Sequence, residues 1–363
     1  MAEEEVKFLT SGEAAQMLRT ICRQPDNAVT VIFGAGASRG YSRNKHPYAP
    51  PTVAQLFDDR NAAVSEVLNW DRHKEIRSLK SSIERRIRSF SNDLEKYLSD
   101  LYRDNSDNNL FALLIIYLQD LFAFASKNVD LNDNNYKSLA NALFDLRGKR
   151  PLWFLTFNYD TILEQSIEDL HVYIPRRSFS DGSGYTSAFP KVSKLHGGIN
   201  FRYVFDTDGD EQLPHHDIFS RMMRDKSETH QVIAADSSMP YMITRRDKLT
   251  AGLQYNFPLM MIPVHGEVSP ENGYFNKQIG HAREVISNSA LVIAIGYNFG
   301  DEQFLNSIKA AIKPEAELIL VGSSDLVIGP KDHDCYKNIS KVWPREKISV
   351  FEGDGFQSFT DSL

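Results

Sequence analysis

The chain of 363 residues contains only two cysteines, Cys22 and Cys335, which lie far apart in the sequence. This scarcity excludes a disulfide-rich scaffold, because such scaffolds need several cysteine pairs. It also excludes a zinc site built from paired CxxC motifs, which takes four thiolates. We therefore predict no metal site, and the cysteine content fits a reducing compartment.

The chain also lacks an excess of positive charge. Its 41 lysines and arginines are outnumbered by 48 aspartates and glutamates, which leaves a formal net charge of −7. A chain without a global positive field does not attract a phosphate backbone. We expect no direct nucleic-acid partner.

Secretory signals and membrane spans are missing as well. The first residues, MAEEEVKF, are acidic, whereas a secretory signal begins with a basic and then an apolar segment. The most apolar stretch, LFALLIIYLQDLFAFA (110–125), carries Gln119 and Asp120 in its middle and is too short to cross a bilayer. We interpret it as a buried helix and expect a cytoplasmic protein without membrane contact.

What the chain does have is strands that alternate with helices. Short apolar runs predict strands at 29–33, 152–157, 192–195, 257–264, 290–295, 317–322 and 347–351. Helical patterns follow several of them, for example at 277–289 and 302–313. This alternation predicts an α/β fold with a doubly wound, mostly parallel, Rossmann-like sheet.

Two segments interrupt that alternation. Residues 60–147 read almost entirely as helix, with an apolar stripe from Ile76 to Leu101 at helical spacing. We interpret 60–147 as an inserted all-helical subdomain, which divides the sheet domain into 1–59 and 148–363. The stripe either packs a core or contacts a partner, and its basic opposite face is typical of a solvated helix. Residues 206–245 are polar and predict an irregular excursion.

Ligands of open parallel sheets bind beyond the carboxyl ends of the strands. The run at 29–33 ends in GAGASRG, where Arg39 stands in place of the third glycine of the GxGxxG dinucleotide fingerprint. Gly34 and Gly36 permit a close approach to the backbone, and amides at the start of the next helix can face a pyrophosphate. A tight strand–helix turn without a ligand explains the same residues.

Two further motifs follow predicted strands, TFNYD and KLHGG. Asn158 and Asp160 can hydrogen-bond a sugar hydroxyl or hold a water, although both residue types are also favoured helix caps. His196 lies beside two glycines and is of the residue type that titrates near neutral pH, as a general base requires. A lone histidine is nevertheless more often structural.

The ordered series GAGAS, TFNYD, LHGG and IGYNFGD resembles the sirtuin (silent information regulator) family, whose GAG, TQN and HG signatures and glycine–serine turn run in the same order. The resemblance implies a Rossmann-like domain that binds NAD and breaks its nicotinamide–ribose bond. It implies that Asn158 and Asp160 lie at the nicotinamide ribose and that His196 is the general base. The remaining residues that it implies are Gly34, Ala35, Gly36 and Ser38 along the pyrophosphate, and Gly296, Asn298, Gly322 and Ser323 toward the adenosine half.

The departures from the sirtuin deacylases are also informative. Two cysteines cannot build their four-cysteine zinc module, and RGYSRNKHPYAPP stands where they carry GIPDFR. These features resemble the sirtuin-like proteins of bacterial anti-phage systems, such as those that work with a HerA-type ATPase. That resemblance implies an NAD+ glycohydrolase that uses NAD+ as its substrate and depletes it in abortive infection. It also implies control by assembly, as a homo-oligomer or with a partner protein.

The chemistry is coherent on these residues. Breaking the bond from ribose C1′ to nicotinamide releases a neutral leaving group through an oxocarbenium-like transition state. Asn158 can orient the ribose and a water, and His196 can accept the proton. An NAD-dependent deacylase and a non-catalytic sensor of NAD or ADP-ribose stay open as alternatives. A dehydrogenase with a ribose contact at Asp58 or Asp59 fits less well, because Arg39 breaks the fingerprint.

Overall fold

The computed structural model describes residues 6–24, 27–42, 46–90, 94–103, 108–132, 134–147, 152–168, 191–207, 231–234, 242–245, 253–260, 273–322 and 334–363. The strands are β1 (Lys7–Leu9), β2 (Ala28–Phe33), β3 (Leu152–Thr156), β4 (Lys191–Lys194), β5 (Gly197–Thr207), β6 (Gln231–Ala234), β7 (Met242–Arg245), β8 (Leu253–Met260), β9 (Ser289–Ile295), β10 (Glu317–Val321) and β11 (Ile348–Phe351). The α-helices are α1 (Ser11–Arg23), α2 (Ala35–Arg39), α3 (Ala62–Leu68), α4 (Lys74–Ser89), α5 (Leu94–Arg103), α6 (Asn108–Asn128), α7 (Asn135–Arg147), α8 (Ile162–Glu168), α11 (Gly273–Asn288), α12 (Glu302–Ile308), α14 (Asp334–Ile339) and α15 (Gly355–Asp361).

The main sheet confirms the predicted doubly wound α/β fold. Its seven strands run in the order β1-β11-β10-β9-β2-β3-β4, and every neighbouring pair is parallel. The chain therefore builds outward from β2 through β3 to β4, and then returns to the other side of β2 with β9. The strand order reverses between β2 and β9, which makes that crevice the topological switch point.

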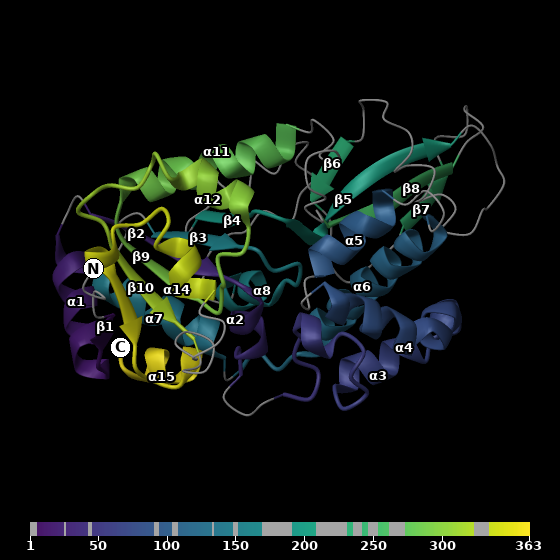
Figure 1. Ribbon diagram of the computed structural model, residues 1–363, viewed down its shortest axis with the longest axis horizontal. Coiled ribbons are helices and arrows are strands. Elements are labelled where there is room, and N and C mark those ends of the chain that lie inside the picture. The colour runs from purple at the N-terminus through teal and green to yellow at the C-terminus, as the bar shows by residue number, and fades with distance from the viewer. Residues whose placement is uncertain are drawn as a thin grey trace.

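Helices cover both faces of this sheet, because its strands are apolar on both faces (Figure 1). We call the two layers the α1-side core and the α11-side core. The α1-side core includes Leu18, Val31, Phe33, Tyr136, Ile293 and Phe359. The α11-side core includes Ile32, Leu155, Val285, Val292, Phe304 and Ile339. Successive residues of β2 and β9 alternate between the two cores, as the period of a strand requires.

A second sheet corrects the sequence analysis. Strands β6, β5, β8 and β7 form a four-stranded antiparallel sheet in that order, apart from the parallel one (Figure 1). The strand expected at 257–264 is β8, which begins earlier, at Leu253, and belongs to this sheet. The expectation of an irregular 206–245 is wrong where β6 and β7 lie. They escaped the sequence analysis because each is only four residues long, which is too short to show a period.

Helices α3 to α6 form one side of the molecule and share the α1-side core (Figure 1). The predicted apolar stripe is divided between α4 and α5, and its member Leu79 is exposed rather than buried. Helix α7 packs against α1, α8 and α15, beside the main sheet. The proposed division into 1–59 with 148–363 and an insertion at 60–147 stays a prediction.

Helix α6 is the buried helix expected at 110–125. By length and composition alone its segment Asn109–Asn128 could cross a membrane, but 78 % of its most apolar stretch is buried inside the protein. Its two central polar residues are buried as well. Asp120 forms an ion pair with Arg72 at 2.7 Å and a hydrogen bond with Nε2 of His73 at 2.7 Å. The polar residues in the apolar run therefore serve helix packing.

Some element boundaries also differ from the sequence patterns. Helix α12 ends at Ile308, whereas the pattern predicted 313. Strand β1 is only three residues long and was not predicted, because three residues are too few to show a period.

Candidate active site

The GAG and GYN turns meet at the switch point. Gly34 follows β2, and its N–H donates to the carbonyl of Ile295 at the end of β9, at 3.0 Å. The N–H of Gly36 donates to the carbonyl of Gly296, also at 3.0 Å. Two turns that are distant in the sequence are thus joined by backbone hydrogen bonds, which fixes the floor of the crevice.

The glycines are required by this contact between turns. A Cβ on Gly34 would lie 2.5 Å from the carbonyl oxygen of Gly296, and a Cβ on Gly36 would lie 2.8 Å from its Cα. Gly296 has φ +59°, and a Cβ there would lie 2.3 Å from the nitrogen of Ala37. The sequence analysis attributed the space at Gly34 and Gly36 to a ligand, whereas the backbone of residues 296 and 297 occupies it. Ala35 and Gly36 remain exposed at the start of α2.

Asn158 follows β3 and presents a fixed carboxamide. Its Nδ2 donates to the carbonyl of Gly34 at 2.9 Å and to Oγ of Ser38 at 2.9 Å. Because a carbonyl can only accept, the first bond determines which end of the carboxamide is the nitrogen. Its Oδ1 has no hydrogen-bond partner among the described residues, although the side chain is 7 % exposed. Oδ1 of Asn158 is therefore a hydrogen-bond acceptor of fixed orientation in the site.

Tyr136 of α7 supports that carboxamide. Its hydroxyl lies 3.0 Å from Oγ of Ser38 and 3.5 Å from Nδ2 of Asn158. The side chain is 1 % exposed, and burial raises the pKa of Tyr136 well above its usual value. The phenol therefore stays protonated, and in its bond with Ser38 either hydroxyl can be the donor. The sequence analysis did not find this residue, because no local pattern connects α7 with β3.

His196 follows β4 and pairs with Asp301 at the start of α12. The distance from Nε2 of His196 to Oδ2 of Asp301 is 3.1 Å. Burial opposes the ionisation of Asp301, but the hydrogen bond and charge of His196 and backbone N–H groups of α12 lower the pKa of Asp301 below its usual value. An ionised Asp301 can only accept, so it receives the hydrogen bond from Nε2–H of His196. Asp301 was quoted within GYNFGD but was not assigned a role.

Aromatic rings surround this pair. Phe157 stacks on Tyr297 with ring centroids 4.0 Å apart, and its ring meets the imidazole of His196 edge to face at 4.9 Å. The His196 side chain is 6 % exposed. These contacts restrict the rotation of the imidazole and keep water from most of it.

A charged cluster lies beneath Asn158. Lys194 is fully buried at the end of β4, where its Nζ lies 2.8 Å from Oε1 of Glu164 and donates to the backbone carbonyl of Asp160 at 2.5 Å. Burial raises the pKa of Asp160, against the opposing effect of Lys194. The Oδ1 of Asp160 accepts from the N–H of Ile162 at 3.0 Å, so Asp160 begins α8 as a cap as well as lying at the site. Neither Lys194 nor Glu164 was predicted.

The structure brings five of the eleven predicted residues into direct contact with one another. Gly34, Gly36, Ser38, Asn158 and Gly296 are connected by direct contacts. Asn298 is exposed, and its Oδ1 accepts from the N–H of Gly300 at 3.0 Å within its own loop. Gly322 directly follows β10, and Ser323 lies outside the described residues. Within the described part of the chain, no cluster of histidine, cysteine and acidic side chains suits a metal ion.

No family model matches the chain, and no curated protein does. Solved structures do. A crystal structure of a Sir2 homologue in complex with NAD is 13 % identical over 96 % of this chain and 91 % of that chain, with a TM-score of 0.44. A mutant Sir2 homologue in complex with ADP-ribose is 13 % identical over 96 % and 94 %, with a TM-score of 0.42. Sir2Tm bound to a propionylated peptide is 12 % identical over 95 % of both chains, with a TM-score of 0.38.

Proposed function

We propose that this protein is an NAD+ glycohydrolase that converts NAD+ and water to nicotinamide and ADP-ribose. The observation that carries the proposal is that two groups follow the neighbouring strands β3 and β4: the oriented Oδ1 of Asn158, and His196 in its pair with Asp301. The motif resemblance supports the choice of substrate. Exposed Ala35 and Gly36 at the start of α2 leave the turn accessible to the pyrophosphate.

The proposed reaction needs a group that orients and a group that accepts a proton. The bond between ribose C1′ and the nicotinamide nitrogen breaks, and nicotinamide leaves as a neutral molecule with the electron pair. Asn158 accepts a hydrogen bond from a ribose hydroxyl or from the attacking water. The water oxygen bonds to C1′ while its proton passes to the imidazole of His196. Asp301 then stabilises the imidazolium, as a carboxylate does beside a catalytic histidine.

The test is NAD+ consumption by the purified full-length chain, followed by release of nicotinamide and ADP-ribose. His196→Ala should lower kcat by about two to four orders of magnitude, the range for a positioned acid–base group. Asn158→Ala should lower it by about two to three orders, the range for one positioned hydrogen-bonding group. Asn141→Ala is a matched control, because Asn141 lies on the exposed face of α7. The proposal is wrong if neither the chain alone nor its assembled form consumes NAD+, or if Asn158→Ala is as active as the control.

The same assay separates the alternatives. A deacylase releases nicotinamide only when an acylated peptide is present, whereas a glycohydrolase needs none. A sensor binds NAD+ or ADP-ribose tightly and leaves NAD+ intact.

We also propose, on the motif resemblance, that the reaction serves anti-phage defence in the bacterial cytoplasm. The chain would then act as a homo-oligomer or with a partner such as a HerA-type ATPase. Size-exclusion chromatography with light scattering tests the first, and NAD+ consumption with and without the partner tests the second. A monomeric chain whose activity no partner changes would contradict both forms of control.

A further inference from the structure

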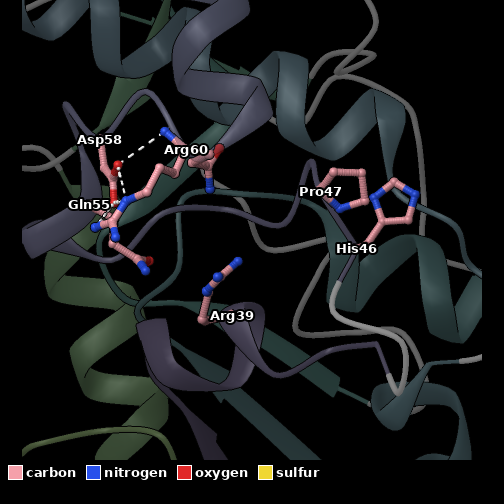
Figure 2. A pocket seen from close by; sticks show the side chains of 7 residues that line it. Arg39, His46, Pro47, Gln55, Asp58 and Arg60 are labelled. Carbon is pink, nitrogen blue, oxygen red and sulfur yellow. Dashed lines mark hydrogen bonds and ion pairs between the residues drawn. The ribbon is translucent and has the colours of Figure 1, made fainter.

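A polar pocket of about 360 Å³ lies beside α2, outside the cluster around Asn158. Its walls are the last residue of α2 and the segment 46–61 that leads to α3. Figure 2 shows Arg39 rising from α2 between Gln55 and Arg60 on one side and His46 and Pro47 on the other. Ligand pockets are typically about 300–1,000 Å³, so this one is larger than a single inorganic ion needs.

The polar groups of this pocket that make no hydrogen bond to another described residue are hydrogen-bond donors. Arg39 makes no hydrogen bond or ion pair with any residue that the structure describes. Gln55 uses its Oε1 to accept from Thr52, which leaves the Nε2 amide group as a donor. His46 accepts the N–H of Tyr48 at Nδ1, at 3.3 Å, so its neutral ring carries the proton on Nε2.

The carboxylate of the pocket is already neutralised. Of the described lining residues, Asp58 alone is acidic, and Arg60 holds both of its oxygens through Nε and Nη2 at 2.8–3.1 Å. The backbone N–H of Arg60 adds a bond of 3.0 Å to Oδ1. The hydrogen bonds from Arg60 lower the pKa of Asp58. The pocket therefore presents one uncompensated cation, Arg39, and several neutral donors, with no free anion among the described lining residues.

We propose that this pocket binds a phosphate-bearing organic ligand, with Arg39 as its main cationic contact and Gln55 and His46 as neutral donors. Phosphate oxygens accept from every donor in this set, and the arginine fork suits their geometry. The ligand is either part of a dinucleotide that also reaches the switch point or a separate phosphate compound. The proposal does not depend on NAD+ cleavage.

The test is calorimetric titration of the full-length chain with inorganic pyrophosphate and with ADP-ribose, at constant ionic strength. We expect Arg39→Gln to weaken pyrophosphate binding by about tenfold or more, the effect of losing a hydrogen-bonded charge. Gln55→Glu should weaken it as well, because it keeps the Oε1 acceptor for Thr52 but turns the donor into a second carboxylate oxygen. Arg19→Gln on the exposed face of α1 removes the same charge and should bind as the wild type does.

The outcomes of these titrations distinguish the two kinds of ligand and test the proposal itself. Competition between ADP-ribose and pyrophosphate supports a dinucleotide that spans both places, and simultaneous binding supports a separate ligand. Circular dichroism checks that Arg39→Gln and Gln55→Glu are folded. The proposal is overturned if the wild type binds neither probe, or if these two variants bind both probes as tightly as Arg19→Gln does. A wild-type chain that binds pyrophosphate through Arg39 yet never consumes NAD+ refutes the proposed function and leaves this pocket standing.

Discussion

At the scale of the residue, the site depends on one carboxamide and one imidazole whose orientations are set by neighbours. Asn158 is held by Gly34, Ser38 and Tyr136, and His196 is held by Asp301. In both cases the supporting group forms a hydrogen bond with one polar atom of the side chain and so fixes the orientation of the carboxamide or of the imidazole. Such supporting contacts can be removed singly, which allows their effect on rate to be separated from their effect on stability.

Replacing Tyr136 by Phe removes the hydroxyl that lies 3.0 Å from Ser38 and leaves the ring in the α1-side core. We expect kcat for the proposed NAD+ cleavage to fall by about fivefold with little change in KM, since one buried hydrogen bond is worth roughly 1 kcal/mol. Tyr117→Phe is the control, because its buried hydroxyl donates to the carbonyl of Leu56 at 2.6 Å, outside the site. Steady-state kinetics of the two variants decide this, and equal kcat values would contradict a positioning role for Tyr136.

The two aspartates of the site predict stability changes of opposite sign with pH. Burial raises the pKa of Asp160, so its contribution is complete below the unfolded value of about 3.9 and is lost as the pH rises through the raised value. The pKa of Asp301 is lowered despite burial, by His196 and backbone N–H groups, so its contribution is present above about 3.9 and is lost as the pH falls through the lowered value.

Urea unfolding of the wild type, Asp160→Asn and Asp301→Asn between pH 3 and pH 8 measures both contributions. Relative to the wild type, Asp160→Asn should gain stability as the pH rises, whereas Asp301→Asn should lose it. A difference of one unit between the pKa of an aspartate in the folded and in the unfolded chain corresponds to about 1.4 kcal/mol in the free energy of unfolding. Parallel curves for the three proteins would contradict both assignments.

At the scale of the element, two turns lock the switch point. The GAG turn after β2 and the GYN turn after β9 approach so closely that a Cβ would clash at Gly34, at Gly36 and at Gly296. The glycines are therefore required by the contact between the two turns. The GYN turn holds the GAG turn in place, and the GAG turn positions Asn158, whose Nδ2 donates to the carbonyl of Gly34.

Gly296→Ala tests this contact. The alanine would need φ near +59° and would place Cβ 2.3 Å from the nitrogen of Ala37, so we expect a loss of about 2–5 kcal/mol in the free energy of unfolding. Gly280→Ala in α11 is the control, because nothing lies within 4 Å of its Cβ position, and it should stabilise by about 0.5–1 kcal/mol. Chemical denaturation gives both values, and a Gly296→Ala protein as stable as the wild type would show that the two turns can separate without cost.

At the scale of the whole molecule, the helices α3 to α6 and the main sheet share one apolar core. The α1-side core runs without interruption from residues of the sheet to Val64, Ile83 and Tyr117 in those helices. A shared core couples the two parts in unfolding, because neither can expose its apolar face without the other. This predicts a single cooperative transition, although a chain of this length often unfolds through intermediates.

The three tryptophans of the chain allow this to be measured. Trp70 packs against the α1-side core near α3, and Trp343 lies in the α11-side core. Two variants that each retain one of these tryptophans, with the others replaced by Phe, should show urea midpoints that coincide in fluorescence. Circular dichroism gives the change in midpoint that each set of substitutions causes by itself. A larger difference between the two fluorescence midpoints would indicate two independent folding units.

Sequence patterns predicted those features that are local in the chain. The apolar runs of β2, β3, β9 and β10 are buried on both faces, and this requires the parallel, doubly wound arrangement that was expected. The antiparallel sheet escaped prediction, because β6 and β7 have only four residues each and β5 pairs with a strand that is distant in the sequence. The split of the stripe at 76–101 into α4 and α5 escaped as well, since periodicity does not report where a helix stops.

The sequence by itself determined which residue types stand at the ends of the strands: two glycines, an asparagine, a histidine and a second glycine turn. Only the tertiary structure decided what they do to one another. It placed Tyr136 on Asn158, Asp301 on His196 and Gly296 on Gly36, in the last two pairs across more than a hundred residues of chain. The physical reason is that periodicity and turn chemistry act between neighbours in the chain, whereas these contacts exist only after distant strands have paired in register.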